Sequence, residues 1–311
     1  MEYHNRKSKI KNQKSKIRIL APAKINIGLL IKNKLPSGYH NIETIMVPIK
    51  LFDTLIIKKK DKGINFKTDM TKLPSGRDNL VVRAAKLFFD KTKIKGGADI
   101  FLEKRIPIGA GLGGGSSDAA QILLGLNQLF GNPLQIEQLR EMAIKIGMDV
   151  PFFLYKKPCY ATGRGDILKP IKIPKLHFVL YTPNYGISTQ WAYENFDKNS
   201  TMYPKGKFEI FGIGAGLTER DFSLKILMKK IISKDLRGIN VLITNSFESL
   251  VFSKHPNLQL IKNRFLADGV YAASLSGTGS SIFGLVEKNM IKTLRNNLRK
   301  DNIKVVFTES I

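Results

Sequence analysis

The chain of 311 residues is long enough for two hydrophobic cores, and 43% of its residues are hydrophobic. Its formal net charge is +26, but 39 lysines outnumber 12 arginines and are spread along the whole chain. A nucleic-acid surface usually clusters arginine with aromatic residues, so we expect no nucleic-acid partner, although the positive field would attract a polyphosphate substrate. The single cysteine, Cys159, excludes an intrachain disulfide, and no ligands stand at zinc spacing.

The amino-terminal segment is strongly basic. Its first 18 residues hold seven lysine or arginine residues, one glutamate and no apolar block of signal-peptide length. We therefore predict a solvated basic tail over residues 1–16 rather than a targeting segment. The chain has no run of 18 apolar residues, so we expect no membrane-spanning helix and no membrane partner. A cytoplasmic location is consistent with the single cysteine.

The first half of the chain mixes extended and helical patterns. Apolar residues at helical spacing predict a helix over 79–90, capped by Asp78, and a second helix from 116 to 130, capped by Ser116 or Ser117. The other elements expected in this half are a strand at 17–31 with a break at Pro22, extended stretches at 39–49 and 52–60, a strand at 98–107, a helix at 136–147, and strands with turns over 148–168.

The pattern restarts after about residue 174. The elements expected there are a strand at 176–183, helices at 218–232 and 245–264, two strands within 269–286 around a small-residue loop, a helix at 291–300 and a strand at 304–310. Strands and helices do not alternate as regularly as in a doubly wound parallel sheet. The sequence therefore predicts two α+β domains, at 17–174 and 175–311.

The most informative stretch is a glycine-rich loop at the start of the predicted second helix. Five glycines lie between positions 109 and 115, at Gly109, Gly111, Gly113, Gly114 and Gly115. Successive glycines let the backbone approach a ligand closely, so that several N–H groups can converge on one anion. The helix that begins beyond them adds unpaired N–H donors and the positive end of its dipole. The stretch therefore predicts a phosphate-binding loop.

Three alternative roles fit these glycines less well. A Walker A loop ends in Gly-Lys-Ser/Thr, but Gly115 is followed by Ser116. Gly109, Gly111 and Gly114 match the dinucleotide-binding pattern, yet Lys104, Arg105 and Pro107 interrupt the strand that should precede it. A turn without ligand would need only one or two glycines. Asp118 in the first helical turn would repel a phosphate, so we expect its side chain to point away from the loop.

Two charged residues outside this loop are candidates for chemistry. Lys24 and Asn26 lie two residues apart, on one face of an apolar strand, where a lysine either meets an anion or sits on a sheet edge. Asp149 stands between apolar residues before Pro151, where it either pairs with a cation or caps a turn. A kinase base is a carboxylate that accepts a hydroxyl proton, and a nearby lysine would keep it ionised. The sequence leaves both alternatives open.

Two turns complete the set of candidates. Tyr39 and His40 lie in the turn "SGYHN", where their rings suit a nucleobase or sugar but are also ordinary surface residues. The stretch "SLSGTGSS" at 274–281 is a second glycine and serine loop, which a hairpin turn alone could account for.

With these stretches in hand, the chain resembles the 4-diphosphocytidyl-2-C-methyl-D-erythritol kinase family of the GHMP kinase superfamily. The resemblance runs from residue 19 to about 287. It rests on the motifs "APAKIN", "SGYHNIETI", "DNLVVRAAKL", "KRIPIGAGLGGGSSDAA", "GMDVPFFL", "ATGRGDIL", "STQWAY" and "SGTGSSIF", which follow one another in the family's order. The motif "GAGLGGGSS" is typical of the superfamily, and "AKIN", "GYH" and "DVPFF" narrow the match.

The resemblance implies a reaction and a set of site residues. It implies ATP-dependent phosphorylation of the 2-hydroxyl of 4-diphosphocytidyl-2-C-methyl-D-erythritol in the non-mevalonate isoprenoid pathway, with Mg²⁺ bound beside ATP. Lys24 and Asp149 match the family's catalytic pair. Positions matching the substrate site are Asn26, Tyr39, His40, Thr189 and Tyr193. Positions matching the ATP site are Asn79, Lys104, Pro107, Gly109, Ala110, Gly111, Leu112, Gly113, Gly114, Gly115, Ser116 and Ser117. The magnesium ligands stay unassigned, with Ser117 as one candidate.

The resemblance also implies a fold. It is the two-domain α+β GHMP kinase fold, with a ribosomal-protein-S5-domain-2-like ATP-binding domain followed by a ferredoxin-like substrate domain. We expect a small-molecule substrate and a monomer or weak homodimer. The chain departs from the family at Ser246, which replaces an acidic residue, and at 196–217, which looks like an insertion.

Two other functions compete with this interpretation. A GHMP kinase for homoserine, mevalonate or a sugar would keep the glycine loop and lose the cytidine pocket. A basic nucleic-acid-binding protein would need clustered cations and would have no use for Asp149.

Overall fold

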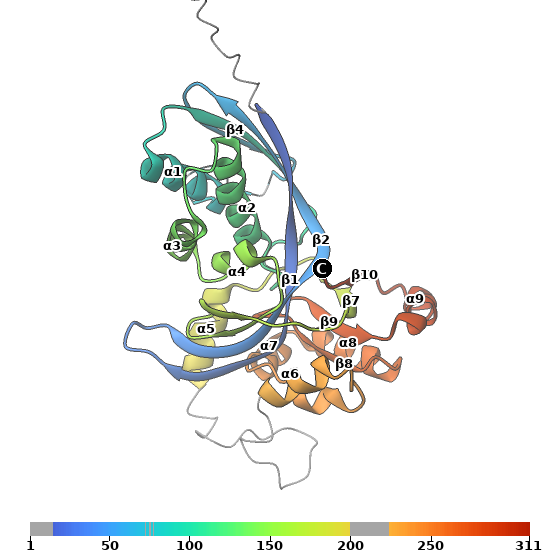
Figure 1. Cartoon of the computed structure of the whole chain (residues 1–311). Coiled ribbons are helices and arrows are strands. Elements are labelled where there is room, and N and C mark those ends of the chain that lie inside the picture. Colours follow the sequence, from blue (N-terminus) through green and yellow to red (C-terminus); the bar gives the residue numbers. More distant parts are fainter. Residues whose placement is uncertain (1–14, 72, 75, 77, 200–223) are drawn as a thin grey trace, which may run out of the picture.

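The computed structural model describes residues 15–71, 73, 74, 76, 78–199 and 224–311, which form two sheets with their covering helices (Figure 1). Most of the predicted basic tail and most of the predicted 196–217 insertion lie outside the described residues. The mixture of helices and of mainly antiparallel strands confirms the α+β class.

The first sheet has six strands in the order β3-β4-β2-β5-β6, with β1 paired to β2. Its strands are β1 (Lys16–Lys34), β2 (His40–Lys60), β3 (Gly63–Thr68), β4 (Gly97–Glu103), β5 (Cys159–Thr162) and β6 (Ile167–Pro170). All neighbours are antiparallel except the parallel pair β3 and β4. Because β2 is long, it pairs with β4 at one end and with β5 at the other, while β1 follows its whole length.

The two long strands differ from the sequence prediction. Pro22 does not break β1, and the two extended stretches expected at 39–49 and 52–60 form the single strand β2. The register between β1 and β2 shifts at Pro22, where a bulge accommodates a residue without an N–H group. Beyond this bulge, Lys24 lies opposite Pro48.

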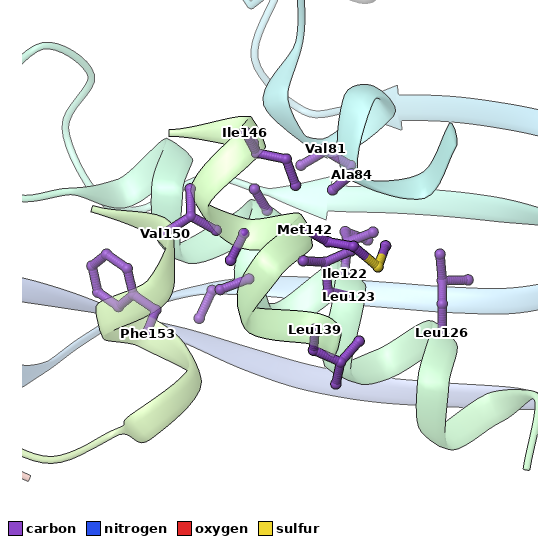
Figure 2. Close-up of a cluster of buried hydrophobic side chains, with 14 of the residues drawn as sticks. Val81, Ala84, Ile122, Leu123, Leu126, Leu139, Met142, Ile146, Val150 and Phe153 are labelled. Carbon is purple, nitrogen blue, oxygen red and sulfur yellow. The ribbon is translucent and has the colours of Figure 1, made fainter. Parts of the chain in front are cut away.

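Four helices cover one face of this sheet. They are α1 (Leu80–Thr92), α2 (Gly114–Leu129), α3 (Ile136–Ile146) and α4 (Val150–Tyr155). Figure 2 shows their apolar side chains meeting in one cluster, with Ile122 and Leu126 of α2 among those of α1, α3 and α4. Helix α2 lies in the middle of this layer, and most of its residues are buried. Because α2 is buried, its first turn is held in place. The glycine loop joins the helix at this turn.

The second sheet has four antiparallel strands in the order β10-β7-β9-β8. Its strands are β7 (His177–Tyr181), β8 (Ala272–Leu275), β9 (Ile282–Val286) and β10 (Val306–Glu309). The helical elements after β7 are α5 (Thr189–Asn199), α6 (Leu224–Ile232), η1 (Ile239–Leu242), α7 (Glu248–Lys254), α8 (Pro256–Ala267), η2 (Lys288–Met290) and α9 (Ile291–Lys300). Figure 1 shows this half below the first sheet, against the lower parts of β1 and β2. The predicted boundary near residue 175 stays a prediction.

Two helical segments correct the sequence prediction. Residues 150–155, expected within a region of strand and turn, form helix α4, because Pro151 suits the first turn of a helix and the two phenylalanines pack into the core. The helix expected over 245–264 is divided into α7 and α8, because Pro256 cannot continue a helix.

Candidate active site

A single cavity of about 890 Å³ gathers most of the candidate residues. Its walls come from β1 and β2, the glycine loop, the starts of α1, α4 and α5, and the loop between β8 and β9. The predicted site residues that line it are Lys24, Asn26, Tyr39, His40, Asn79, Lys104, Pro107, Gly109, Ala110, Gly111, Gly113, Gly114, Gly115, Ser116, Asp149, Thr189 and Tyr193. Leu112 and Ser117 do not line it, because both side chains are buried behind the loop.

The glycine loop is fastened by its carbonyl groups. The bonds that hold it are Ile187 N to Gly109 O (2.9 Å), Ser281 N to Ala110 O (3.1 Å), Lys24 Nζ to Gly111 O (2.9 Å) and Lys24 N to Leu112 O (2.9 Å). Within the described part of the chain, no backbone N–H of residues 109–116 donates a hydrogen bond. These amides, which we call the phosphate end of the cavity, are therefore free to bind an anion.

Glycine is required at several positions of this loop. Gly109, Gly111 and Gly113 have φ values of 66°, 74° and 70°, in the left-handed region that residues with a Cβ atom rarely adopt. A Cβ atom on Gly111 would also lie 1.9 Å from the carbonyl oxygen of Ser276. The loop thus needs glycine both for its conformation and for its contact with the β8–β9 loop.

The predicted serine cap of α2 is wrong. Gly113 occupies the cap position and offers no side chain, and the buried hydroxyl of Ser117 has no hydrogen-bond partner among the described residues. The loop reaches the helix in a left-handed conformation, which places glycine at the cap. The first-turn amides consequently stay unpaired.

Lys24 and Asp149 come together at the centre of the cavity. Lys24 Nζ lies 3.7 Å from Asp149 Oδ2 and donates hydrogen bonds to Gly111 O and to the side-chain oxygen of Asn26. The lysine is buried, whereas the Asp149 side chain is 40% exposed. Burial lowers the pKa of Lys24, and the opposite charge of Asp149 only partly offsets this effect. The structure thus pairs the two residues whose proximity the sequence left open.

Asp149 stands at the N-cap position of α4, but its carboxylate makes no capping hydrogen bond. The alternative of a capping aspartate therefore fails. The pKa of Tyr193 is raised, mainly by burial and further by the negative charge of Asp149. The charge of Asp149 therefore acts across the cavity. The carboxylate is left facing the cavity and the ammonium group of Lys24.

Residues far apart in the sequence hold this centre in place. Asn26 donates from Nδ2 to Thr44 Oγ1 at 2.9 Å, and Thr44 donates in turn to Gly28 O at 2.7 Å. Ser276 donates to Gly111 O at 3.1 Å and accepts from the backbone of Asn26 at 3.3 Å. The β8–β9 loop is therefore more than a hairpin turn, because it braces the glycine loop. Its small residues were a signal for a site, but their partners could not be inferred from the sequence.

The motif "NSFESL" also has a structural role. Asn245 donates to the carbonyl oxygens of Leu275 and Gly277, both at 2.8 Å, and thereby shapes the β8–β9 loop. Ser246, which replaces an acid in the family pattern, accepts a 3.0 Å hydrogen bond from Ile31 N. An ionised carboxylate at position 246 could accept this hydrogen bond as well. The bond to β1 therefore does not depend on serine.

A buried ionic network adjoins the phosphate end, and two of its members, Lys104 and Asp118, line the cavity. Lys104 Nζ contacts Asp53 and donates to Asp118 Oδ2 at 3.0 Å, and all three side chains are buried. Burial lowers the pKa of Lys104, but the two carboxylates outweigh it and raise the pKa above its usual value. Burial also raises the pKa of Asp118, to about 7, against the attraction of Lys104.

Asp53 connects this network to the glycine loop. Its Oδ1 accepts hydrogen bonds from the backbone N–H groups of Arg105, at 2.5 Å, and Ile106, at 2.8 Å. The chain is thereby fixed just before the loop begins. Asp53 was not among the predicted site residues, because a lone aspartate inside an apolar strand carries no motif.

Asn79, rather than the predicted Asp78, caps α1. Its Oδ1 accepts from Val81 N at 2.8 Å, and its Nδ2 donates to Pro74 O at 2.7 Å. Asn79 directly precedes the helix, so its side chain reaches the second helical amide, which Asp78 cannot do.

The opposite side of the cavity is aromatic. The rings of His40 and Tyr193 stack with centroids 5.0 Å apart and an interplanar angle of 26°. Tyr39 is half exposed, and the guanidinium of Arg164 lies 5.3 Å from its ring centroid. Thr189 begins α5, and its Oγ1 lies 3.4 Å from that of Thr278. We call Tyr39, His40 and Tyr193 the aromatic end of the cavity.

The described residues contain no group of three or more histidine, cysteine, aspartate or glutamate side chains arranged to hold a metal. Magnesium needs no such group, because it takes few protein ligands beside nucleotide phosphates and water. The residues with side-chain oxygens that line the cavity near the glycine loop include Ser116, Asp118 and Asp149. Likewise, no helix in the described ranges is long and apolar enough to cross a bilayer.

Comparison with known proteins agrees with this geometry. The family models for the N-terminal and C-terminal domains of GHMP kinases match residues 79–157 and 227–304. A protein of Thermodesulfovibrio yellowstonii named 4-diphosphocytidyl-2-C-methyl-D-erythritol kinase is 39% identical over 85% of this chain and 87% of its own length. A Chlorobium phaeobacteroides protein of the same name is 37% identical over 94% and 97%. This chain belongs to the 4-diphosphocytidyl-2-C-methyl-D-erythritol kinase family.

Comparison with solved structures shows that the chain has the family's fold. A crystal structure of 4-(cytidine 5'-diphospho)-2C-methyl-D-erythritol kinase matches with a TM-score of 0.76 and 33% identity, over 95% of this chain and all of the other. Mevalonate kinase of L. major matches with a TM-score of 0.73 at 16% identity, over 96% and 97%, and therefore supports the fold alone. Membership of the 4-diphosphocytidyl-2-C-methyl-D-erythritol kinase family confirms the resemblance and the two-domain GHMP kinase fold.

Proposed function

We propose that this chain transfers the γ-phosphoryl group of ATP to the 2-hydroxyl of 4-diphosphocytidyl-2-C-methyl-D-erythritol in the non-mevalonate isoprenoid pathway. Family membership supports the reaction. The observation that carries it is that one cavity joins the unpaired amides of residues 109–116 to the aromatic end. Lys24 contacts the phosphate end by donating a hydrogen bond to Gly111 O. At the aromatic end, the charge of Asp149 contributes to the raised pKa of Tyr193.

Asp149 acts as the general base in this proposal. Its carboxylate accepts the proton of the 2-hydroxyl while the hydroxyl oxygen bonds to the γ-phosphorus and the bond to the β,γ-bridging oxygen breaks, releasing ADP. Lys24, 3.7 Å away, favours the ionised carboxylate and stabilises negative charge on the transferring phosphoryl group. Asn26 fixes the position of the lysine through the hydrogen bond between their side chains.

The phosphate end holds ATP. Its amides and the positive end of the α2 dipole face the phosphates, and the carbonyl hydrogen bonds keep the amides oriented before ATP binds. Asn79, Lys104 and Pro107 line the same cavity and provide the adenine side. Bound Mg²⁺ would neutralise the charge of the phosphates, and Ser116, which lines the cavity, would hold it rather than the buried Ser117.

The aromatic end binds the cytidyl group. Tyr39 and Tyr193 offer ring faces for stacking on the base, and His40 offers a ring nitrogen to its edge. Thr189 lies at the start of α5 and positions the methylerythritol part of the substrate.

We further propose that the enzyme is a cytoplasmic monomer or weak homodimer of two domains, 17–174 and 175–311, and acts without nucleic acid or membrane. The scattered lysines and the lack of a spanning helix among the described residues support this view.

The test is ATP consumption by the purified protein with Mg²⁺ and, in parallel, the cytidyl compound, homoserine, mevalonate or galactose. The proposal predicts turnover with the cytidyl compound alone. Turnover with another acceptor would keep the phosphate end and reject the cytidine pocket. No turnover with any acceptor would favour a binding protein without catalysis.

A further inference from the structure

We propose that Asp197 is a positioning residue that sets the ring tautomer of His40, and that this tautomer makes the pocket prefer cytosine to uracil. The inference rests on the proposed function, because it concerns how the aromatic end distinguishes its base. Asp197 lies four residues after Tyr193, near the end of α5, and belongs to none of the motifs found in the sequence.

Asp197 holds His40 through a direct hydrogen bond. Its Oδ1 lies 2.7 Å from His40 Nε2, and its Oδ2 accepts from Lys34 Nζ at 2.6 Å. Burial alone would raise the pKa of Asp197, but the bonds from Lys34 and His40 outweigh it and hold the pKa below its usual value. An ionised carboxylate can only accept hydrogen bonds, so Nε2 of His40 must carry a proton.

The ring of His40 is also fixed in its plane. It stacks on Tyr193 at 5.0 Å and meets the edge of Phe196 at 6.3 Å, with an interplanar angle of 89°. Both aromatic residues lie on α5, the helix that carries Asp197. The histidine is 8% exposed, so this helix determines both the plane of the ring and the protonated nitrogen.

The second ring nitrogen is available to a ligand. Among the described residues, Nδ1 of His40 has no hydrogen-bond partner, and His40 lines the cavity. In a neutral ring protonated on Nε2, Nδ1 presents a lone pair and can only accept a hydrogen bond. Cytosine carries an amino donor at position 4, whereas uracil carries a carbonyl oxygen, which would place two acceptors against each other. A site that hydrogen-bonds one group discriminates strongly against an analogue that lacks it.

The chain offers a matched control outside the cavity. Glu309 Oε2 lies 3.6 Å from His177 Nδ1 and forms a second carboxylate and histidine pair in the other sheet. Replacing Glu309 by glutamine changes the neighbour of a histidine without touching the aromatic end.

The first experiment reads the tautomer by NMR of full-length protein with ¹⁵N-labelled histidine, at a pH above the usual histidine range. The chain has four histidines, and the His40→Gln variant assigns the signals of His40. We expect His40 to be protonated on Nε2 in the wild type and in Asp197→Asn, whose Oδ1 still accepts. In Asp197→Ala we expect a mixture of tautomers, and in Glu309→Gln no change at His40. A wild-type His40 protonated on Nδ1, or on both nitrogens, would overturn the proposal even if neither Asp197 variant folds.

The second experiment measures steady-state kinetics with the cytidyl acceptor and its uridyl analogue. In Asp197→Ala, KM for the cytidyl acceptor should rise roughly tenfold, as expected for one lost hydrogen bond, while kcat and KM for ATP stay within about twofold. The uridyl analogue should change little, and Asp197→Asn should recover most of the loss.

Equal losses for both acceptors, or a loss confined to kcat, would contradict a role in base recognition. A wild type inactive with the cytidyl acceptor would reject the proposed function and base recognition together. The NMR result would still decide whether Asp197 sets the ring of His40, so the two failures are distinguishable.

Discussion

The two ends of the cavity are built in different ways. The phosphate end is one continuous stretch, and its neighbours hold it by five carbonyl hydrogen bonds that leave its amides unpaired: those to Gly109, Ala110 and Leu112, and two to Gly111. The aromatic end combines Tyr39 in the turn before β2 and His40 at the start of β2 with helix α5, more than a hundred residues later. Its rings are joined by stacking and by one carboxylate rather than by backbone hydrogen bonds.

This difference suggests a division of roles. A loop with fixed amides can bind the phosphates of any ATP-dependent reaction of the superfamily, whereas side chains on separate elements can change to suit another acceptor. We therefore expect substitutions that disturb the contacts of the phosphate end to reduce folding stability and every turnover, and substitutions at the aromatic end to affect the acceptor alone.

The largest effect is expected where the two ends meet. Asp149→Asn should lower kcat on the order of 10³-fold, because the variant lacks the proton acceptor, while ATP binding stays nearly intact. Steady-state kinetics and ATP titration of the same protein separate these effects. Asp99→Asn, which removes an exposed carboxylate near Lys60, is the control. Turnover of Asp149→Asn at the wild-type rate would disprove its role as base.

The next effect concerns the buried network that adjoins the phosphate end. Asp53→Ala should lower the free energy of unfolding by about 3 to 5 kcal/mol, because it leaves two backbone amides without a partner and Lys104 with only one of its two buried carboxylates. Urea denaturation measures the loss. Asp99→Asn should cost less than about 1 kcal/mol, since its ion pair is exposed. Equal losses in the two variants would show that the buried network does not stiffen this end.

Two glycines of the loop provide a closer comparison. Gly111→Ala should destabilise the protein by more than about 1 kcal/mol, because φ is 74° and the added Cβ would overlap the carbonyl of Ser276. Gly115→Ala should keep the wild-type melting temperature, since its Cβ would meet only Leu80, at 3.6 Å. Thermal unfolding of both variants tests whether the loop is as tightly constrained as its contacts indicate. Similar melting temperatures would contradict that.

The smallest effect is expected at the aromatic end. Tyr39→Ala should raise the KM for the cytidyl acceptor roughly tenfold through lost base stacking, with little change in KM for ATP. Tyr185→Ala, which removes a tyrosine stacked on His255, should leave both constants within about twofold. A change confined to the KM for ATP would show that Tyr39 acts on ATP rather than on the cytidyl group, and would contradict the assignment of the aromatic end.

The sequence predicted the local features well. Helices α1 and α2, the strands β8 and β9, the α+β class and the family were inferred correctly, because each rests on periodicity or on a contiguous motif. Helix α4 was missed because its paired phenylalanines also suit a strand. The caps at Asn79 and Gly113 were misassigned because several adjacent residues can cap a helix, and only the backbone conformation decides between them.

The contacts between distant segments could not be predicted. Nothing near Asp53 in the sequence indicates that it binds Lys104, and nothing near Ser276 indicates that it braces Gly111. Such contacts depend on how the strands and loops pack in three dimensions. Tyr39 and His40 were candidates from their turn, Tyr193 was inferred only through the resemblance, and the roles of all three residues stay predictions.

The central claim is that one cavity brings ATP and the cytidyl acceptor together for phosphoryl transfer. The most direct test is ³¹P NMR of the purified protein with Mg²⁺, ATP and 4-diphosphocytidyl-2-C-methyl-D-erythritol. We predict one new phosphomonoester signal, assigned to the 2-position of the acceptor, that grows in step with ADP and is absent with Asp149→Asn. ADP formation without a phosphorylated acceptor, or phosphate on a different hydroxyl, would contradict the account.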